Sequence, residues 1–220
     1  MPKVKIPRKG TTVDMTAMCD VAFLLLTFFM LATKFKPEEP VQVTTPNSIS
    51  EIPLPDKDIM MITIDPKGRL FFSIDNKEVR KKLINTMDEY KKLGLTDQEK
   101  LAFAIGASIG TPFNQLKSYL SSDPDAQKAY DKTTMGIPTD TTVTSEKNEL
   151  ADWIRLARNT NPQLRITIKA DGKAAYPQIS KVIKTLSGWK IFKFNLITGL
   201  KAVPAGTAAY AIKNGGGEAK

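Results

Sequence analysis

The longest apolar stretch in the chain runs from Met15 to Thr33 and contains a single charged residue, Asp20. Nineteen residues in a helix rise by about 28 Å, which nearly matches the hydrocarbon core of a bilayer. The next apolar run, Leu101–Gly110, is too short to cross and contains two glycines. The pattern therefore predicts a single transmembrane helix over residues 13–34.

Charges on either side of this span predict its orientation. Lys3, Lys5, Arg8 and Lys9 lie before it with no acid among them, and the two lysines that follow it are succeeded at once by Glu38 and Glu39. Positive-inside counting places residues 1–12 in the cytoplasm as a basic tail, and the residues after the span in the periplasm of a cell with an inner membrane. A cleaved signal peptide is disfavoured, because Asp20 stands at the head of the apolar run and Ala32-Thr33-Lys34 is a weak cleavage site.

Residues 35–58 contain five prolines spread along the segment, which exclude a helix and predict an extended linker. Two apolar stretches in it, around Val41 and Val43 and around Ile52 and Leu54, alternate well enough to add to the sheet edge of a partner. A passive tether is the alternative for the same segment.

Alternating and helical patterns predict one periplasmic α+β domain over residues 59–201. Its expected elements are strands at Met60–Ile64, Arg69–Ile74, Leu164–Ala170 and Lys190–Leu200, and helices at Lys77–Leu93 and Tyr176–Ser187. This order favours a two-layer sandwich of a sheet with helices on one face. Residues 202–220, which contain Gly215-Gly-Gly217, are expected to form a flexible tail.

Residues 91–145 read as a helical insertion into this domain. Thr96 and Glu99 have the spacing of a capping box, and Pro112 and Pro124 are each expected at a first helical position. An amphipathic helix is expected over Ser145–Asn159. The insertion either packs on the sheet or forms a contact surface for a partner.

The composition limits the kinds of catalytic and metal sites that the chain can contain. The chain has one cysteine, Cys19, and no histidine, which argues against zinc sites, disulfides and the usual catalytic triads. No pair of acids has a recognisable catalytic spacing, so we expect no enzyme, catalytic residue, metal or cofactor.

Charge leaves the choice of a surface partner open. The net charge is +9, and from Arg165 to Lys201 eight basic residues face the single acid Asp171. This stretch indicates either an anionic partner, such as cell-wall polymer, lipid headgroups or an acidic protein face, or an ordinary solvated surface. Nucleic acid is disfavoured because no binding motif is present.

Asp20 is the candidate functional residue of the membrane span. An ionisable group there costs about 2.5–3.5 kcal/mol on insertion scales, which cancels most of the favourable contribution of the neighbouring apolar residues. At 100° per residue, Thr16 lies about 40° and Thr27 about 20° from Asp20, so the three form one polar stripe. Such a stripe indicates a partner helix or a water-filled path. Asp20 either binds and releases protons or is held in a fixed ion pair or hydrogen bond within an oligomer.

The run VDMTAMCDVAFLLLTFFML resembles the signature of the ExbD/TolR family of biopolymer-transport proteins, and is closest to ExbD. The resemblance covers the tail, the span, and the stretches Ile59–Tyr90 and Leu164–Lys201. It implies that Asp20 carries protons, with Thr27 in support, inside a ring of ExbB-like subunits that drives a TonB-like protein, and that a second copy of the chain is a partner.

Two other functions stay open at this point. One is a TolR-like subunit of the Tol–Pal envelope system, and the other is a membrane-anchored module that binds peptidoglycan. Residues 91–145 exceed the usual domain of the family, so the resemblance assigns them no role.

Overall fold

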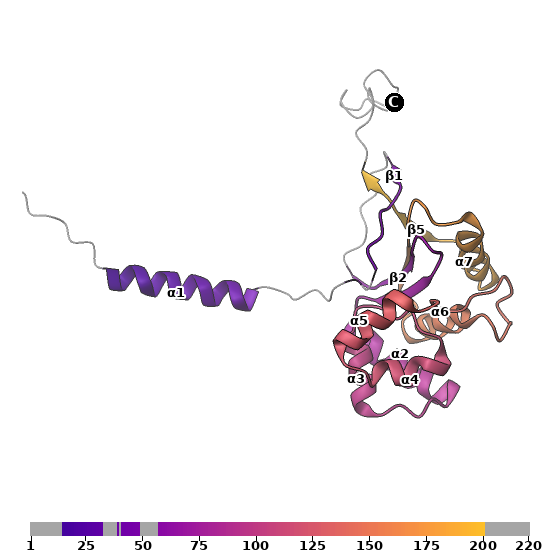
Figure 1. Ribbon diagram of the computed structural model, residues 1–220, viewed down its shortest axis with the longest axis horizontal. Helices are drawn as coiled ribbons and strands as arrows, with labels where there is room; N and C mark the ends of the chain where they lie inside the picture. Colours follow the sequence, from indigo (N-terminus) through magenta and orange to yellow (C-terminus); the bar gives the residue numbers. More distant parts are fainter. Residues whose placement is uncertain (1–14, 33–38, 40, 49–56, 201–220) are drawn as a thin grey trace, which may run out of the picture. The chain divides into compact units, whose positions relative to one another are not determined.

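The computed structural model describes residues 15–32, 39, 41–48 and 57–200, which fall into two units divided after Lys36. The first unit contains helix α1, Met15–Ala32, drawn in indigo in Figure 1. Its 18 residues have a mean hydropathy of 2.0 and none is buried, because the aliphatic and phenyl side chains point outward all round. In the described part of the chain, α1 is the one helix long and apolar enough to cross a membrane.

The second unit is built on a mixed sheet. Strand β2, Ile59–Ile64, pairs antiparallel with β3, Leu70–Ile74, through a turn in which the Gly68 N–H donates to the Asp65 carbonyl over 2.9 Å. On its other side β2 pairs in parallel with β4, Arg165–Ala170, and β4 with β5, Phe194–Ile197. The order among the described strands is β3-β2-β4-β5.

One face of this sheet holds the main core. The side chains of Met60, Ile62 and Ile64 are fully buried, and those of Ile166 and Ile168 continue the same face. Helices α2 (Lys77–Lys91), α6 (Glu149–Thr160) and α7 (Tyr176–Gly188) complete the core with their apolar stripes. The α+β class with a helix-covered sheet is thereby confirmed.

Helix α2 begins as its sequence predicts and ends earlier. The Asn76 side chain accepts the N–H groups of Glu78 and Val79, as expected of an N-cap. The predicted end at Leu93 is wrong, because Lys92 already takes a left-handed conformation (φ 53°) and closes the helix after Lys91.

The insertion forms three helices, α3 (Asp97–Ile105), α4 (Phe113–Leu120) and α5 (Pro124–Thr133). The capping box of Thr96 and Glu99 is confirmed, as is Pro124 at the start of α5. Pro112 was expected inside α4 and is instead its N-cap, with extended backbone.

Aromatic stacking and backbone pairing fasten the insertion to the rest of the domain. The Trp153 ring of α6 stacks on Phe72 of β3 at 5.3 Å and on Phe103 of α3 at 5.6 Å between ring centroids. Ile109 exchanges two backbone hydrogen bonds with Phe72, so the insertion also covers part of the outer edge of β3. The buried Arg80 side chain of α2 donates to the Phe103 carbonyl.

Two predicted elements near the C-terminal half are corrected. The helix expected from Ser145 begins at Glu149, because the Asn148 side chain caps it and closes the preceding loop. The strand expected over Lys190–Leu200 is split. Lys190 has φ 58°, only Phe194–Ile197 joins the main sheet as β5, and β6 (Gly199–Leu200) pairs in parallel with β1 (Asn47–Ser48).

Candidate functional site

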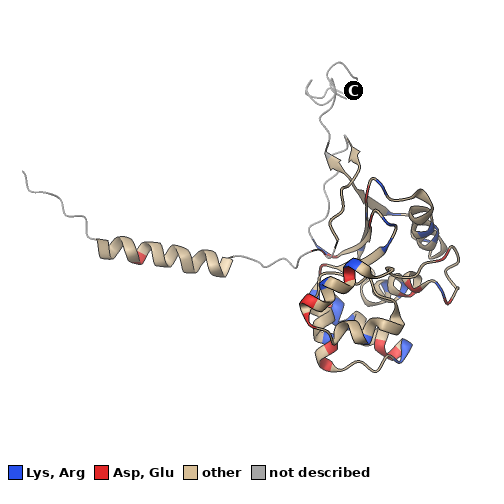
Figure 2. Cartoon of the chain, viewed as in Figure 1, with Lys and Arg blue, Asp and Glu red and all other residues tan. Residues whose placement is uncertain are grey.

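The polar stripe of α1 lies on one uninterrupted helix. Asp20 is its single charged residue, visible as the one red segment of α1 in Figure 2. Thr16 precedes Asp20 by one turn and Thr27 follows it by two, so regular helical geometry places all three within about 40° of one another. The structure thus keeps the three predicted residues on one side of the helix.

The geometry of the stripe limits what each residue can do. Thr27 Oγ1 donates to the Leu24 carbonyl over 2.9 Å, so its hydroxyl proton is already used and its oxygen can serve only as an acceptor. Two turns of rise put Thr27 about 10 Å along the axis from Asp20, too far for direct contact. The stripe can therefore line a path for a proton or cation in which Asp20 is the ionisable group.

Residues 41–48, which we call the strap, belong to the second unit and are held by hydrogen bonds to the rest of that unit. Thr44 donates its N–H to Asp171 Oδ2 over 2.7 Å and accepts the Gly172 N–H over 2.9 Å. The Pro46 carbonyl accepts the Gly199 N–H over 2.8 Å, next to the pairing of β1 with β6.

Of the four candidate partner-binding residues, two belong to the strap and two do not. Val41 and Val43 of the strap are half-buried and alternate with exposed neighbours, as a half-covered extended segment should. Ile52 and Leu54 lie outside the described residues. Through β1, the strap thus pairs with strand β6 of its own chain.

A buried charged cluster joins the sheet to the insertion, and sequence reasoning missed it. Arg69 Nε lies 2.6 Å from Asp65 Oδ2, and Arg69 Nη1 donates to the carbonyls of Asp131, Lys132 and Thr134. These carbonyls belong to the end of α5, where helix carbonyls lack intrahelical partners. The available signal was an Asp and an Arg four residues apart, at the turn between two strands.

Asp131 itself has an unusual environment. Burial raises the pKa of its carboxyl to about 6, although the hydrogen bond from Tyr119 and the charge of Arg69 act in the opposite direction. Asp131 Oδ2 accepts the Tyr119 hydroxyl over 3.1 Å, while Oδ1 has no hydrogen-bond partner. Burial likewise raises the pKa of Tyr119.

A cavity of about 660 Å³ lies between the start of the strap and the insertion. Its lining includes Glu39 and Val41, and from the insertion Tyr119, Gln127 and Asp131. Glu39 also forms an ion pair with Lys169 of β4. Among the described residues no group of three or more His, Cys, Asp or Glu side chains could hold a metal ion.

Comparisons with known proteins bear on most of the chain. The family model described as "Biopolymer transport protein ExbD/TolR" matches residues 7–201, a range that includes α1, the strap, the sheet and the insertion. No curated protein and no solved structure matches. Because the family match extends over most of the sequence, the chain belongs to the ExbD/TolR family of biopolymer transport proteins.

Proposed function

We propose that this chain is the proton-carrying subunit of an ion-driven motor that energises transport across the outer membrane, in a complex of the ExbB–ExbD–TonB kind. The observation that carries the proposal is the placement of Asp20 on a threonine-lined side of an otherwise apolar helix. Lipid satisfies none of these polar groups, so a protein ring or a water-filled path must face them.

The mechanism follows from the chemistry of a carboxyl group in low dielectric. Apolar surroundings favour the neutral form of a carboxyl and water favours the ionised form, so Asp20 takes up a proton when wetted from one side and releases it to the other. A proton that crosses 100 mV releases about 2.3 kcal/mol, which shifts a two-state equilibrium roughly fiftyfold. Movement of α1 would be passed along the chain to the periplasmic domain.

Orientation and partners complete the proposal. The N-terminal Lys3, Lys5, Arg8 and Lys9 favour a cytoplasmic N-terminus and a periplasmic domain. ExbB-like subunits form the ring around α1, a second copy of the chain shares that ring, and a TonB-like protein is acted on by the domain. The chain carries out no covalent chemistry of its own.

Replacement of Asp20 by Asn tests the proposal, because it keeps the size of the side chain and removes its ionisation. Energised uptake across the outer membrane should be lost, while membrane insertion and co-purification with the ring protein persist. Cys19→Ala is the matched control, since its side chain lies about 100° away on the same turn. Full uptake by a stably inserted Asp20→Asn protein would contradict the proposal.

A TolR-like role in the Tol–Pal system is the second candidate, favoured by the family description, which covers both proteins. The same Asp20→Asn protein distinguishes the two, since loss of envelope integrity during division with normal uptake would assign the Tol–Pal role. A membrane-anchored peptidoglycan-binding module predicts a third outcome, in which the variant keeps full function.

A further inference from the structure

The loop after α7 exposes aromatic and basic side chains together. Within Gly188-Trp-Lys-Ile-Phe-Lys193, the Phe192 side chain is 72 % exposed and that of Trp189 is 37 % exposed. Lys190 and Lys193 alternate with them and are exposed as well. Such a combination is typical of segments that lie at a membrane–water interface.

The loop holds these side chains outward because its backbone is fixed. The N–H groups of Trp189 and Ile191 both donate to the Leu186 carbonyl, at 3.1 and 3.0 Å. Lys190 takes the left-handed conformation at φ 58°, which turns the chain sharply after the helix. Ile191 packs against the core, so the residues on either side of it face solvent.

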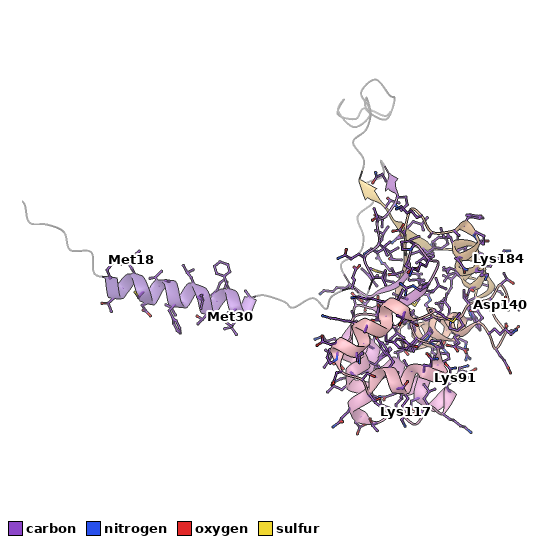
Figure 3. The ribbon with its side chains drawn as sticks, viewed as in Figure 1. Met18, Met30, Lys91, Lys117, Asp140 and Lys184 are labelled. Atoms are coloured by element: carbon purple, nitrogen blue, oxygen red, sulfur yellow. The ribbon has the colours of Figure 1, made fainter. Side chains whose placement is uncertain are left out.

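Charge around the loop has one sign. From Gly172 to Leu200 the chain contains five lysines and no acid, and Lys184, labelled in Figure 3, is exposed on the last turns of α7. An acid on a neighbouring element is Asp140, whose backbone carbonyl accepts the hydroxyl of Thr185. Its carboxylate already accepts the Thr141 N–H over 2.7 Å.

We infer that Trp189, Phe192 and the lysines beside them dock the domain on the anionic phospholipid surface of the membrane in which α1 is anchored. The inference relies on the proposed anchoring by α1, which keeps the domain of the same chain at a high effective concentration near lipid. Lysines pair with lipid phosphates, and the two rings enter the headgroup region.

Lipid fits this surface better than a polysaccharide does. Ligand sites are usually concave, with a few polar side chains placed to fix the orientation of the ligand. The stretch from Ser187 to Phe194 contains no amide or carboxylate side chain. Rings flanked by lysines on an exposed loop instead suit a membrane surface, where anionic headgroups lie over an apolar hydrocarbon core.

Trp189 supplies its own reporter, because the other tryptophan, Trp153, is fully buried in the core. The full chain is reconstituted in vesicles that contain brominated phosphatidylcholine, with or without phosphatidylglycerol. Bromine should quench Trp189 and its emission should shift to the blue in the anionic vesicles, and high salt should reverse both effects. Trp189→Phe leaves only Trp153 and gives the background.

Charge reversal separates docking from chance proximity. Lys190→Glu with Lys193→Glu should lower the docked fraction at least tenfold, since each lysine at an anionic surface is worth about fivefold in binding. Lys81→Glu with Lys82→Glu makes the same charge change on an exposed part of α2 and should leave quenching intact. Phe192→Ser should weaken quenching without a change in charge.

Two results would overturn the inference. One is Trp189 quenching that is equal in neutral and anionic vesicles and insensitive to the lysine reversal. The other is sedimentation with peptidoglycan that depends on Lys190 and Lys193 while Trp189 stays unquenched. Asp20→Asn should dock like the parent chain, so failure of docking and failure of the motor function are separate outcomes.

Discussion

Tyr119 donates its hydroxyl to the Asp131 carboxylate over 3.1 Å, and both side chains are buried where α4 meets α5. Asp131 is therefore a buried carboxyl with a hydrogen bond to only one of its oxygens. Because burial is the largest influence on this carboxyl, its pKa in the folded protein, about 6, lies above the value of the unfolded chain.

This relationship predicts a pH dependence of stability. The folded state binds the proton more tightly than the unfolded state, so the contribution of Asp131 is fully present below pH 4 and is lost as pH rises through 6. Two pKa units correspond to about 3 kcal/mol. In Asp131→Asn, the free energy of unfolding should fall less between pH 4 and pH 8 than in the parent chain.

Urea titrations of the full chain in detergent, followed by tryptophan fluorescence, measure this difference. Asp125→Asn, an exposed carboxyl on the same helix, is the control and should follow the parent. An Asp131→Asn protein with the parent's pH dependence would show that the carboxyl does not titrate differently on folding.

Arg69 should be one of the most sensitive positions in the domain. Arg69→Ala leaves the Asp65 carboxylate, whose side chain is 1 % exposed, without its cation and frees the carbonyls at the end of α5. Loss of one partner of a buried pair costs about 3 to 5 kcal/mol. Lys67→Ala, in the same turn and exposed, should change the unfolding free energy by less than about 0.5 kcal/mol.

Replacement of Asn148 by Asp should destabilise the domain. Its Oδ1 accepts the Ala151 N–H over 3.1 Å, which Asp could reproduce, but its Nδ2 also donates to Asp140 O, Thr142 O and Thr185 Oγ1. In Asn148→Asp these three oxygens lose their N–H donor, and a charged carboxylate is buried. The free energy of unfolding, measured by urea titration, should therefore fall by about 2 to 4 kcal/mol. Asn114→Ala on exposed α4 surface is the control, and equal stability of both variants would refute the argument.

The buried Asp171 should protect the strap from hydrogen exchange more than the exposed Glu39 does. Asp171→Ala removes the charged acceptor of the Thr44 N–H, and hydrogen exchange over residues 41–48 should speed up by about tenfold to a hundredfold. Glu39→Gln breaks the more exposed ion pair with Lys169 and should change exchange by less than about fivefold. Similar effects of the two substitutions would mean that Asp171 does not hold the strap.

Local signals in the sequence accounted for much of the fold. Alternation marked three of the four strands of the main sheet, and caps such as Asn76 and the Thr96–Glu99 box marked helix starts. The errors arose at element ends, where a helix cap or a left-handed residue sets the boundary. At Lys190 the Leu186 carbonyl and the packing of Ile191 turn the chain, so the strand predicted there begins later.

The sequence by itself determined the apolar span, the position of Asp20 in it and the angular stripe with Thr16 and Thr27, because a helix has a fixed rotation per residue. Only the tertiary structure decided that the strap lies on its own domain, that Arg69 binds the end of α5 and that Asp131 is buried beside Tyr119. These contacts join residues far apart in the chain, and no local pattern encodes which distant groups will exclude water together.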